Sequence, residues 1–129
     1  MKCTPALTLD TDSPFWVTRD VFEQVFDQAD FHCRNQELVE GNYSKHWFYV
    51  DEEGSNRFLL PTVNIISGKT QLINGRHRTA VLFERIDIIP IAFVTGRAVD
   101  LAKSLGLEPV HNNEQIELPD LPIVNRPEY

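Results

Sequence analysis

The feature that most constrains the fold is a series of short apolar runs between residues 46 and 94, each followed by turn-forming residues. Aromatic and β-branched residues dominate these runs, which is typical of β-strands. The shorter runs span residues 46–50, 57–60, 62–66 and 71–73. The last run, Ile86–Val94, is almost continuously apolar. It predicts a strand buried on both faces, in which Pro90 marks an edge or a bulge.

Helical spacing of apolar residues predicts helices around these strands. The first runs from Thr18 to about Asp30, with Thr18 as the N-cap and a phenylalanine-rich buried stripe. A second begins at His77 and includes the residues up to Glu84, and a third spans Ala98–Leu105. Together with the strands, they predict an α+β fold in which helices flank a small mixed β-sheet.

The length of the chain predicts a single domain. Its 129 residues fall within the ~100–150 residues of a typical domain, and a hydrophobic fraction of 42% is enough to build a core. We expect residues 1–13 to be loosely held and residues 14–106 to form the α+β core. Residues 107–129 should form a Pro-rich C-terminal tail, part of which packs on the body.

The sequence predicts neither a membrane segment nor a disulfide scaffold. No stretch approaches the ~18 apolar residues of a membrane span, and the start has no apolar run of signal-peptide length. The two cysteines, Cys3 and Cys33, do not form a Cys-x-x-Cys spacing. We therefore expect a cytoplasmic protein with reduced thiols and no membrane partner. The oligomeric state stays open.

Charge is distributed unevenly along the chain. The formal net charge is −7, which disfavours a protein whose whole surface binds nucleic acid. Residues 57–85 nevertheless hold five basic side chains and one acidic side chain, a local charge of +4. Such a concentration predicts a focused anion site in an otherwise acidic protein.

The most unusual part of this basic region is the turn between the predicted strand 71–73 and the helix that follows it. The turn consists of Asn74, Gly75, Arg76, His77, Arg78 and Thr79. The first turn of a helix exposes unpaired N–H groups and the positive end of the dipole, so basic side chains there are unfavourable. A bound anion would remove that penalty by accepting hydrogen bonds from the N–H groups and from a guanidinium.

A purely structural explanation of this turn is also open at the level of sequence. Arg76 or Arg78 can pair with one of the nineteen carboxylates of the chain. Surface pairs of that kind contribute only about 0–1 kcal/mol.

The segment from Pro61 to Val94 contains, in order, PTVNII, SGK, TQLI, NGRHRTAVLFE and IDIIPIAFV. The segment begins with a strand after proline, a short turn and a strand that ends in a Gly-x-(His/Arg)-Arg box. A helix with small residues and a further strand follow. This order resembles the ParB/sulfiredoxin-like superfamily, and in particular its ParB N-terminal-like nucleotide-binding domain.

The resemblance implies a site in which nucleotide phosphates rest on the box and on the helix N-terminus. Members of the superfamily include a partition protein that binds and hydrolyses CTP, sulfiredoxin, which uses ATP, and a serine kinase that uses ADP. The implied cofactor is therefore a nucleoside triphosphate or diphosphate (ATP, ADP or CTP), alone or with Mg²⁺. By position, the implied binding residues are Asn74, Gly75, Arg76, His77, Arg78 and Thr79, with Arg76, His77 and Arg78 as the catalytic candidates.

This chain also departs from the superfamily pattern. Sulfiredoxin has its catalytic cysteine directly after the box glycine, where this chain has Arg76, so we do not expect peroxiredoxin repair. Partition proteins continue into helix-turn-helix and dimerisation regions, whereas a short helix and a Pro-rich tail follow here. Autonomous sequence-specific DNA binding is therefore not expected.

Other candidate sites have weaker patterns. His32, Cys33 and His46 have no regular metal-ligand spacing. The acidic residues 51–53 can hold Mg²⁺ or form a solvated turn, and Glu37 or Glu40 can supply a general base or simply face the solvent.

These observations leave three functional hypotheses. The first is a nucleotide- or phosphate-binding domain, either a phosphotransferase or an NTP hydrolase, that uses the Gly-Arg-His-Arg turn. The second is a non-catalytic module that binds nucleic acid or an acidic or phosphorylated partner through the same turn. The third, a nuclease, is disfavoured by the net charge and by the lack of a metal-binding pattern.

Overall fold

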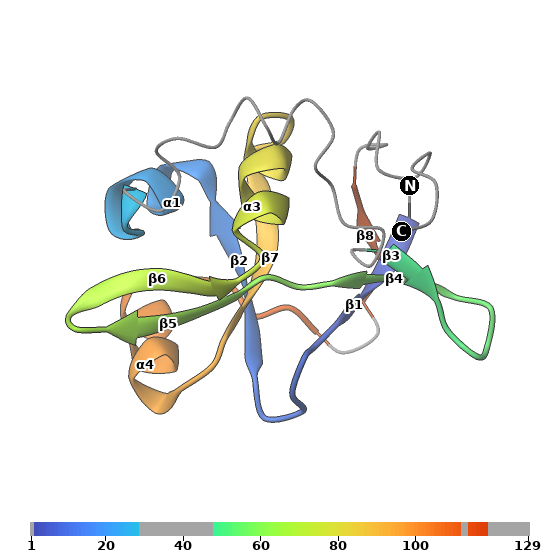
Figure 1. Cartoon of the computed structure of the whole chain (residues 1–129), viewed down its shortest axis with the longest axis horizontal. Coiled ribbons are helices and arrows are strands. Elements are labelled where there is room, and N and C mark those ends of the chain that lie inside the picture. The colour runs from blue at the N-terminus through green and yellow to red at the C-terminus, as the bar shows by residue number, and fades with distance from the viewer. Residues whose placement is uncertain (1, 29–47, 112–113, 119–129) are drawn as a thin grey trace.

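A computed structural model describes residues 2–28, 48–111 and 114–118 of the chain, and the elements below carry the labels of Figure 1. The strands are β1 (Lys2–Ala6), β2 (Ser13–Thr18), β3 (Phe48–Val50), β4 (Asn56–Leu59), β5 (Thr62–Ile66), β6 (Lys69–Asn74), β7 (Ile88–Phe93) and β8 (Ile116–Glu117). The helices are α1 (Arg19–Val25), α3 (Arg76–Phe83) and α4 (Gly96–Ser104).

The strands form two four-stranded sheets, both mixed. The first has the order β3-β4-β1-β8, and only β1 and β4 run parallel in it. The second has the order β2-β7-β5-β6, and only β5 and β7 run parallel. The predicted α+β class is confirmed, but the expected single sheet is two sheets.

The chain changes sheets between β4 and β5, at Leu60 and Pro61. The Leu60 N–H donates to the Ala6 carbonyl of β1 at 3.0 Å, so it still belongs to the first sheet. The carbonyl of Pro61 accepts from the Ala92 N–H of β7 at 2.9 Å, so it already belongs to the second. In Figure 1 the two strands run on from each other across the middle of the molecule.

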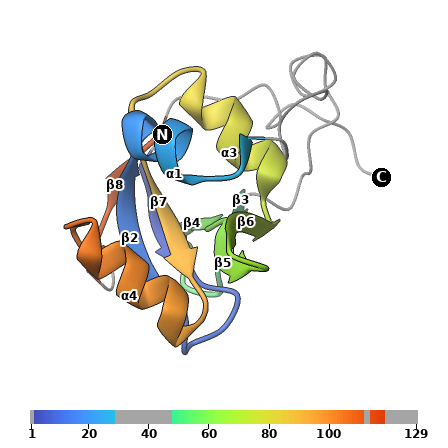
Figure 2. The ribbon, with the colours of Figure 1, turned by 90° about the vertical axis from the view of Figure 1, so that its left-hand side faces the viewer.

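Helices cover the second sheet from both sides (Figure 2). α1 and α3 lie next to each other, joined by a stacked pair of rings, Phe22 and Phe83, whose centroids are 4.7 Å apart. α4 packs against β5 and β7 from the other side. One continuous hydrophobic cluster includes Phe58 of the first sheet and Val63 and Ile91 of the second, so both sheets share a core.

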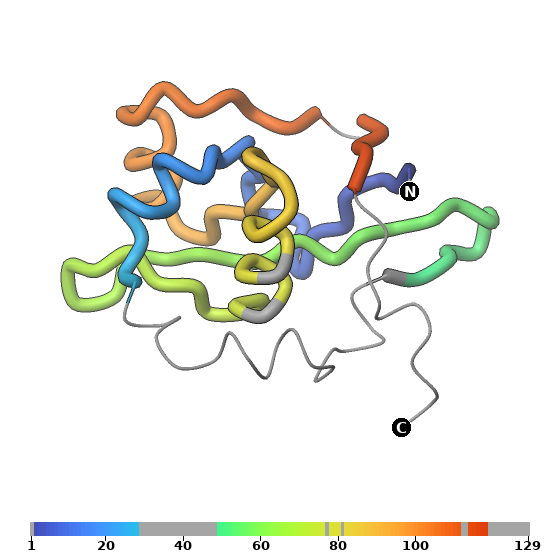
Figure 3. Tube along the Cα trace, turned by 90° about the horizontal axis from the view of Figure 1, so that it is seen from above, coloured from blue at the N-terminus to red at the C-terminus, as the bar shows by residue number. Residues whose placement is uncertain are grey.

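The segment after α4 closes the far side of the molecule (Figure 3). The Trp16 N–H donates to the Glu108 carbonyl at 2.8 Å, and the Val110 N–H donates to the Pro14 carbonyl at 3.0 Å, which ties this segment to β2. Ile116 and Leu118 are buried. Residues 119–129 of the tail lie outside the described residues.

The expectation that residues 1–13 are loosely held was wrong for β1. Its residues pair with β4 on one edge and with β8 on the other, and Cys3 and Ala6 are buried. Cys3 and Ala6 lie three positions apart, on opposite faces of the strand, so the segment shows neither an apolar run nor the alternation that would mark a strand in the sequence. Burial also raises the pKa of the Cys3 thiol to about 11.

Pro90 lies inside β7, a central strand with an unbroken register to β2, rather than at the sheet edge or bulge that the sequence suggested. The Ala92 N–H points to β5, so the nitrogen of Pro90, two residues earlier, faces the same side. Pairing with β5 begins only at Ala92, so the missing N–H of Pro90 leaves no ladder bond unmade there.

The helix boundaries follow their caps. Thr18 accepts a hydrogen bond from the Val21 N–H at 3.2 Å, which confirms it as the N-cap of α1, but the helix ends by Phe26, before the expected Asp30. Thr95 caps α4 in the same way, and the left-handed Gly106 follows its end. The expected strand residues 46 and 47 lie outside the described residues.

Candidate anion-binding site

The turn that the sequence singled out connects β6 to α3. Gly75 occupies the N-cap position with φ of +89°, in the left-handed region that favours glycine, and no side chain caps the helix. The first N–H groups of a helix have no partner within the helix. The start of α3 therefore presents N–H donors that no capping side chain of this turn satisfies.

Gly75 also makes room for a guanidinium. A Cβ atom at this position would lie 2.7 Å from Nη2 of Arg78 and 2.7 Å from Cβ of Pro61. The Arg78 side chain thus folds back over its own turn, against the point where the chain changes sheets. Glycine is required here by the backbone conformation and by the space that Arg78 occupies.

Arg78 is the most unusual residue of the turn because its charge is enclosed. Its relative exposure is only 6%. Among the described residues, nothing accepts a hydrogen bond from its Nε or Nη2, and no carboxylate forms an ion pair with it. Burial lowers its pKa to about 10, so the guanidinium is still protonated at neutral pH. For Arg78, the carboxylate pairing that the sequence left open is therefore not made by the described residues.

Arg19, the first residue of α1, shows what a structural arginine at a helix start does in the same protein. Its Nη1 lies 3.1 Å from the Asp87 carboxylate, and its Nη2 donates to the Ile86 carbonyl at 3.1 Å. Both terminal nitrogens of Arg19 therefore have acceptors within the protein, and only its Nε has none among the described residues. By contrast, Nε and Nη2 of Arg78 have no acceptor in the part of the chain that the structure describes.

Thr79 stabilises the turn in this structure. Its hydroxyl donates to the Gly75 carbonyl at 2.8 Å, and its N–H donates to the same carbonyl at 3.0 Å. The side chain is fully buried. The hydroxyl hydrogen of Thr79 is thus used in a hydrogen bond inside the protein. The expected donation from Thr79 to a ligand stays a prediction.

The other expected site residues lie around the same turn. Asn74 ends β6, exposed and paired with Thr62 of β5, and Arg76 is half-buried at the start of α3. His77 belongs to the first turn of α3, but its side chain lies outside what the structure describes. Sequence reasoning missed Pro61 as part of the site, because only the fold brings it against Gly75.

The acidic residues 51–53 form the turn between β3 and β4. Oδ1 of Asp51 accepts hydrogen bonds from the Glu53 and Ser55 N–H groups, both at 2.9 Å. This is the arrangement of a structural turn. Within residues 2–28, 48–111 and 114–118, no three His, Cys, Asp or Glu side chains gather in a way that could hold a metal ion. His32, Cys33, Glu37, Glu40 and His46 lie outside the described residues.

No protein-family model, curated protein or solved structure matches this chain. The resemblance to the ParB/sulfiredoxin-like superfamily therefore stays a prediction from the sequence. In the part of the chain that the structure describes, no helix has the length and apolar character needed to cross a membrane.

Proposed function

We propose that the turn Gly75–Thr79 binds the phosphate groups of a nucleotide and that the chain is a nucleotide-binding domain. The observation that carries the proposal is the enclosed guanidinium of Arg78, whose Nε and Nη2 lack hydrogen-bond partners among the described residues. A buried charge without a partner costs several kcal/mol, roughly, even after the surroundings relax. A bound oxyanion would supply the missing acceptors.

The uncapped start of α3 supports the same ligand. An anion at a helix N-terminus accepts hydrogen bonds from backbone N–H groups and is stabilised by the positive end of the helix dipole. Gly75 has no side chain to block this approach. Phosphate suits both the guanidinium and the helix N–H groups because it can accept hydrogen bonds from all of them at once.

In a phosphotransferase or NTP hydrolase, Arg78 and Arg76 would stabilise charge on the transferring phosphoryl group. His77 is the remaining candidate for contact with that group. Mg²⁺ would be held mainly by the phosphate oxygens of the nucleotide, as is usual for this ion.

The test is calorimetric titration with inorganic phosphate, ADP, ATP, CTP and GTP, each with and without Mg²⁺. We expect binding of at least one nucleotide that Arg78→Gln weakens by at least ~10-fold, because a charge-assisted hydrogen bond is lost. Arg97→Gln is the matched control, since Arg97 is exposed on α4. Failure of every nucleotide to bind, or equal binding by Arg78→Gln, contradicts the proposal.

The local charge of +4 over residues 57–85 favours a second candidate, a non-catalytic module that binds nucleic acid or a phosphorylated partner. Its signature is retention on a nucleic-acid duplex that weakens steeply with salt. Duplex binding that depends on Arg78, in a protein that binds no nucleotide, would support this candidate over the first.

A further inference from the structure

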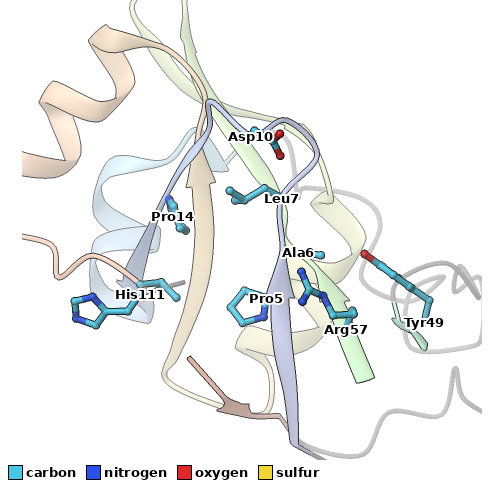
Figure 4. Close-up of a pocket in the computed structure, with 9 residues that line it drawn as sticks. Pro5, Ala6, Leu7, Asp10, Pro14, Tyr49, Arg57 and His111 are labelled. Carbon is cyan, nitrogen blue, oxygen red and sulfur yellow. The ribbon is translucent and has the colours of Figure 1, made fainter. Parts of the chain in front are cut away.

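A concave site lies away from the turn Gly75–Thr79, in the gap where β1 and β2 diverge into different sheets (Figure 4). The groove has a volume of about 330 Å³. That is at the lower end of the ~300–1,000 Å³ of small-molecule sites, so it suits a small ligand. Pro5 and Pro14 line its opposite walls, and the loop between the two strands closes one end.

One wall of the groove carries two polar side chains that come from paired strands. Tyr49 of β3 and Arg57 of β4 are directly opposite each other in the antiparallel register, so their side chains share one face of the sheet. In Figure 4 the phenol oxygen of Tyr49 and the guanidinium of Arg57 extend toward the same region beside Ala6. Together they offer hydrogen-bond donors suited to a carboxylate.

These donors are largely unused within the described residues. The Arg57 guanidinium has one long ion pair, 3.9 Å from the Asp51 carboxylate, and neither Arg57 nor the Tyr49 hydroxyl has a hydrogen bond there. Arg57 is held in place nonetheless, since only 27% of its side chain is exposed. A carboxylate can therefore be bound without displacing a strong internal partner.

The opposite charge lies at the closed end of the groove. Asp10 belongs to the loop between β1 and β2, where its carboxylate is exposed and makes no hydrogen bond to the described residues. Asp10 and Asp51 together outnumber Arg57, so a phosphate dianion is disfavoured here by repulsion. A ligand with one carboxylate and one ammonium group matches the two ends.

We propose that this groove binds a small amino-carboxylate, with its carboxylate on Arg57 and Tyr49 and its ammonium group on Asp10. The proposal goes beyond the nucleotide-binding function and does not depend on it, because Arg78 lies at a different turn and takes no part in the groove. The apolar ring faces of Pro5 and Pro14 would contact the methylene groups of such a ligand.

A chain-length series of zwitterions tests the proposal: glycine, β-alanine and γ-aminobutyrate, with acetate and ethylamine as half-ligands. The readout is a heteronuclear NMR titration of the whole chain, in which binding must shift the backbone amides of Ala6, Tyr49 and Arg57. We expect one zwitterion to bind more tightly than either half-ligand. Arg57→Gln should weaken it by at least ~10-fold, the loss of a charge-assisted hydrogen bond.

Variants at the two ends separate the roles of the charges. Asp10→Asn should weaken the zwitterion and leave acetate binding unchanged, whereas Tyr49→Phe should weaken both. Arg78→Gln and Arg97→Gln should change neither, so failure here is distinguishable from failure of the anion site. If Arg57→Gln does not fold, two results still test the proposal. They are the amide shifts in the native protein and the loss of zwitterion binding in Asp10→Asn.

Two results overturn the proposal. One is the absence of shifts at Ala6, Tyr49 and Arg57 with every member of the series. The other is zwitterion binding that Arg57→Gln or Asp10→Asn leaves unchanged in a folded variant.

Discussion

At the scale of single residues, the proposed role of Arg78 in binding and its effect on stability are opposed. An enclosed guanidinium whose Nε and Nη2 have no acceptor among the described residues destabilises the ligand-free fold, whereas both terminal nitrogens of Arg19 have acceptors at the start of α1. Burial of Arg78 is thus difficult to explain by folding alone. It is explained if the group is kept for an anion, since functional groups are often retained at the expense of stability.

Arg78→Met tests this explanation directly. Because methionine fills similar space without a charge, we expect the free energy of unfolding of the ligand-free protein to rise by about 1–3 kcal/mol. Stabilisation by added phosphate should disappear in the same variant. The measurement is urea unfolding, with and without inorganic phosphate, in native protein and variant. A loss of stability in the variant without phosphate would show that the guanidinium is satisfied inside the fold.

The pH dependence of stability gives an independent check. Burial lowers the pKa of Arg78 from its ordinary value to about 10, so above pH 10 the folded state gives up this proton before the unfolded state does. The unfolded state then binds more protons, and this residue's contribution makes the free energy of unfolding rise with pH. The advantage of Arg78→Met over the native protein should therefore be constant below about pH 9 and shrink toward pH 11. If the difference in free energy of unfolding between Arg78→Met and the native protein does not change with pH, the buried charge of Arg78 is not its cause.

At the scale of secondary-structure elements, the turn between β6 and α3 was predictable because it is local. The order of strand, glycine and helix is visible in the sequence, and α3 begins one residue before the predicted His77. β1 was missed because its two buried residues acquire their environment from β4 and β8, which are remote in the chain. The inward fold of Arg78 was missed for the same reason, since Pro61 lies on another strand connection.

Two glycine substitutions separate backbone strain from the space that Arg78 needs. Gly75 and Gly54 both have positive φ, but a Cβ at Gly54 would meet nothing within 4 Å. Gly54→Ala should cost only the strain of about 1–2 kcal/mol. Gly75→Ala should cost more and should abolish phosphate binding, because its Cβ collides with Arg78 and Pro61. Thermal unfolding and phosphate titration measure both effects, and equal losses in the two variants would count against the close packing of Arg78.

At the scale of the whole molecule, the two candidate sites flank one connection. Pro61 packs against Gly75 of the candidate anion-binding turn, and the neighbouring Leu60 pairs with Ala6, which lines the groove. Leu60 is fully buried within the core that both sheets share. The sheets should therefore unfold together rather than as separate units.

Leu60→Ala tests that cooperativity. Removing a fully buried leucine should lower the free energy of unfolding by about 2–5 kcal/mol. Native-state hydrogen exchange should show the same loss for amides of β4 in the first sheet and of β7 in the second. Protection that falls in only one sheet would mean that the two sheets are independent.

The sequence by itself determined the α+β class, most strand and helix positions between residues 48 and 104, and the basic turn at residues 74–79. These features follow from the spacing of apolar residues, from secondary-structure propensity and from charge among near neighbours, all of which are local in the sequence. Only the tertiary structure decided that two sheets form and that the charge of Arg78 turns inward. It also decided that Asp10, Tyr49 and Arg57 line one groove. Those features depend on contacts between residues far apart in the chain, which local patterns do not encode.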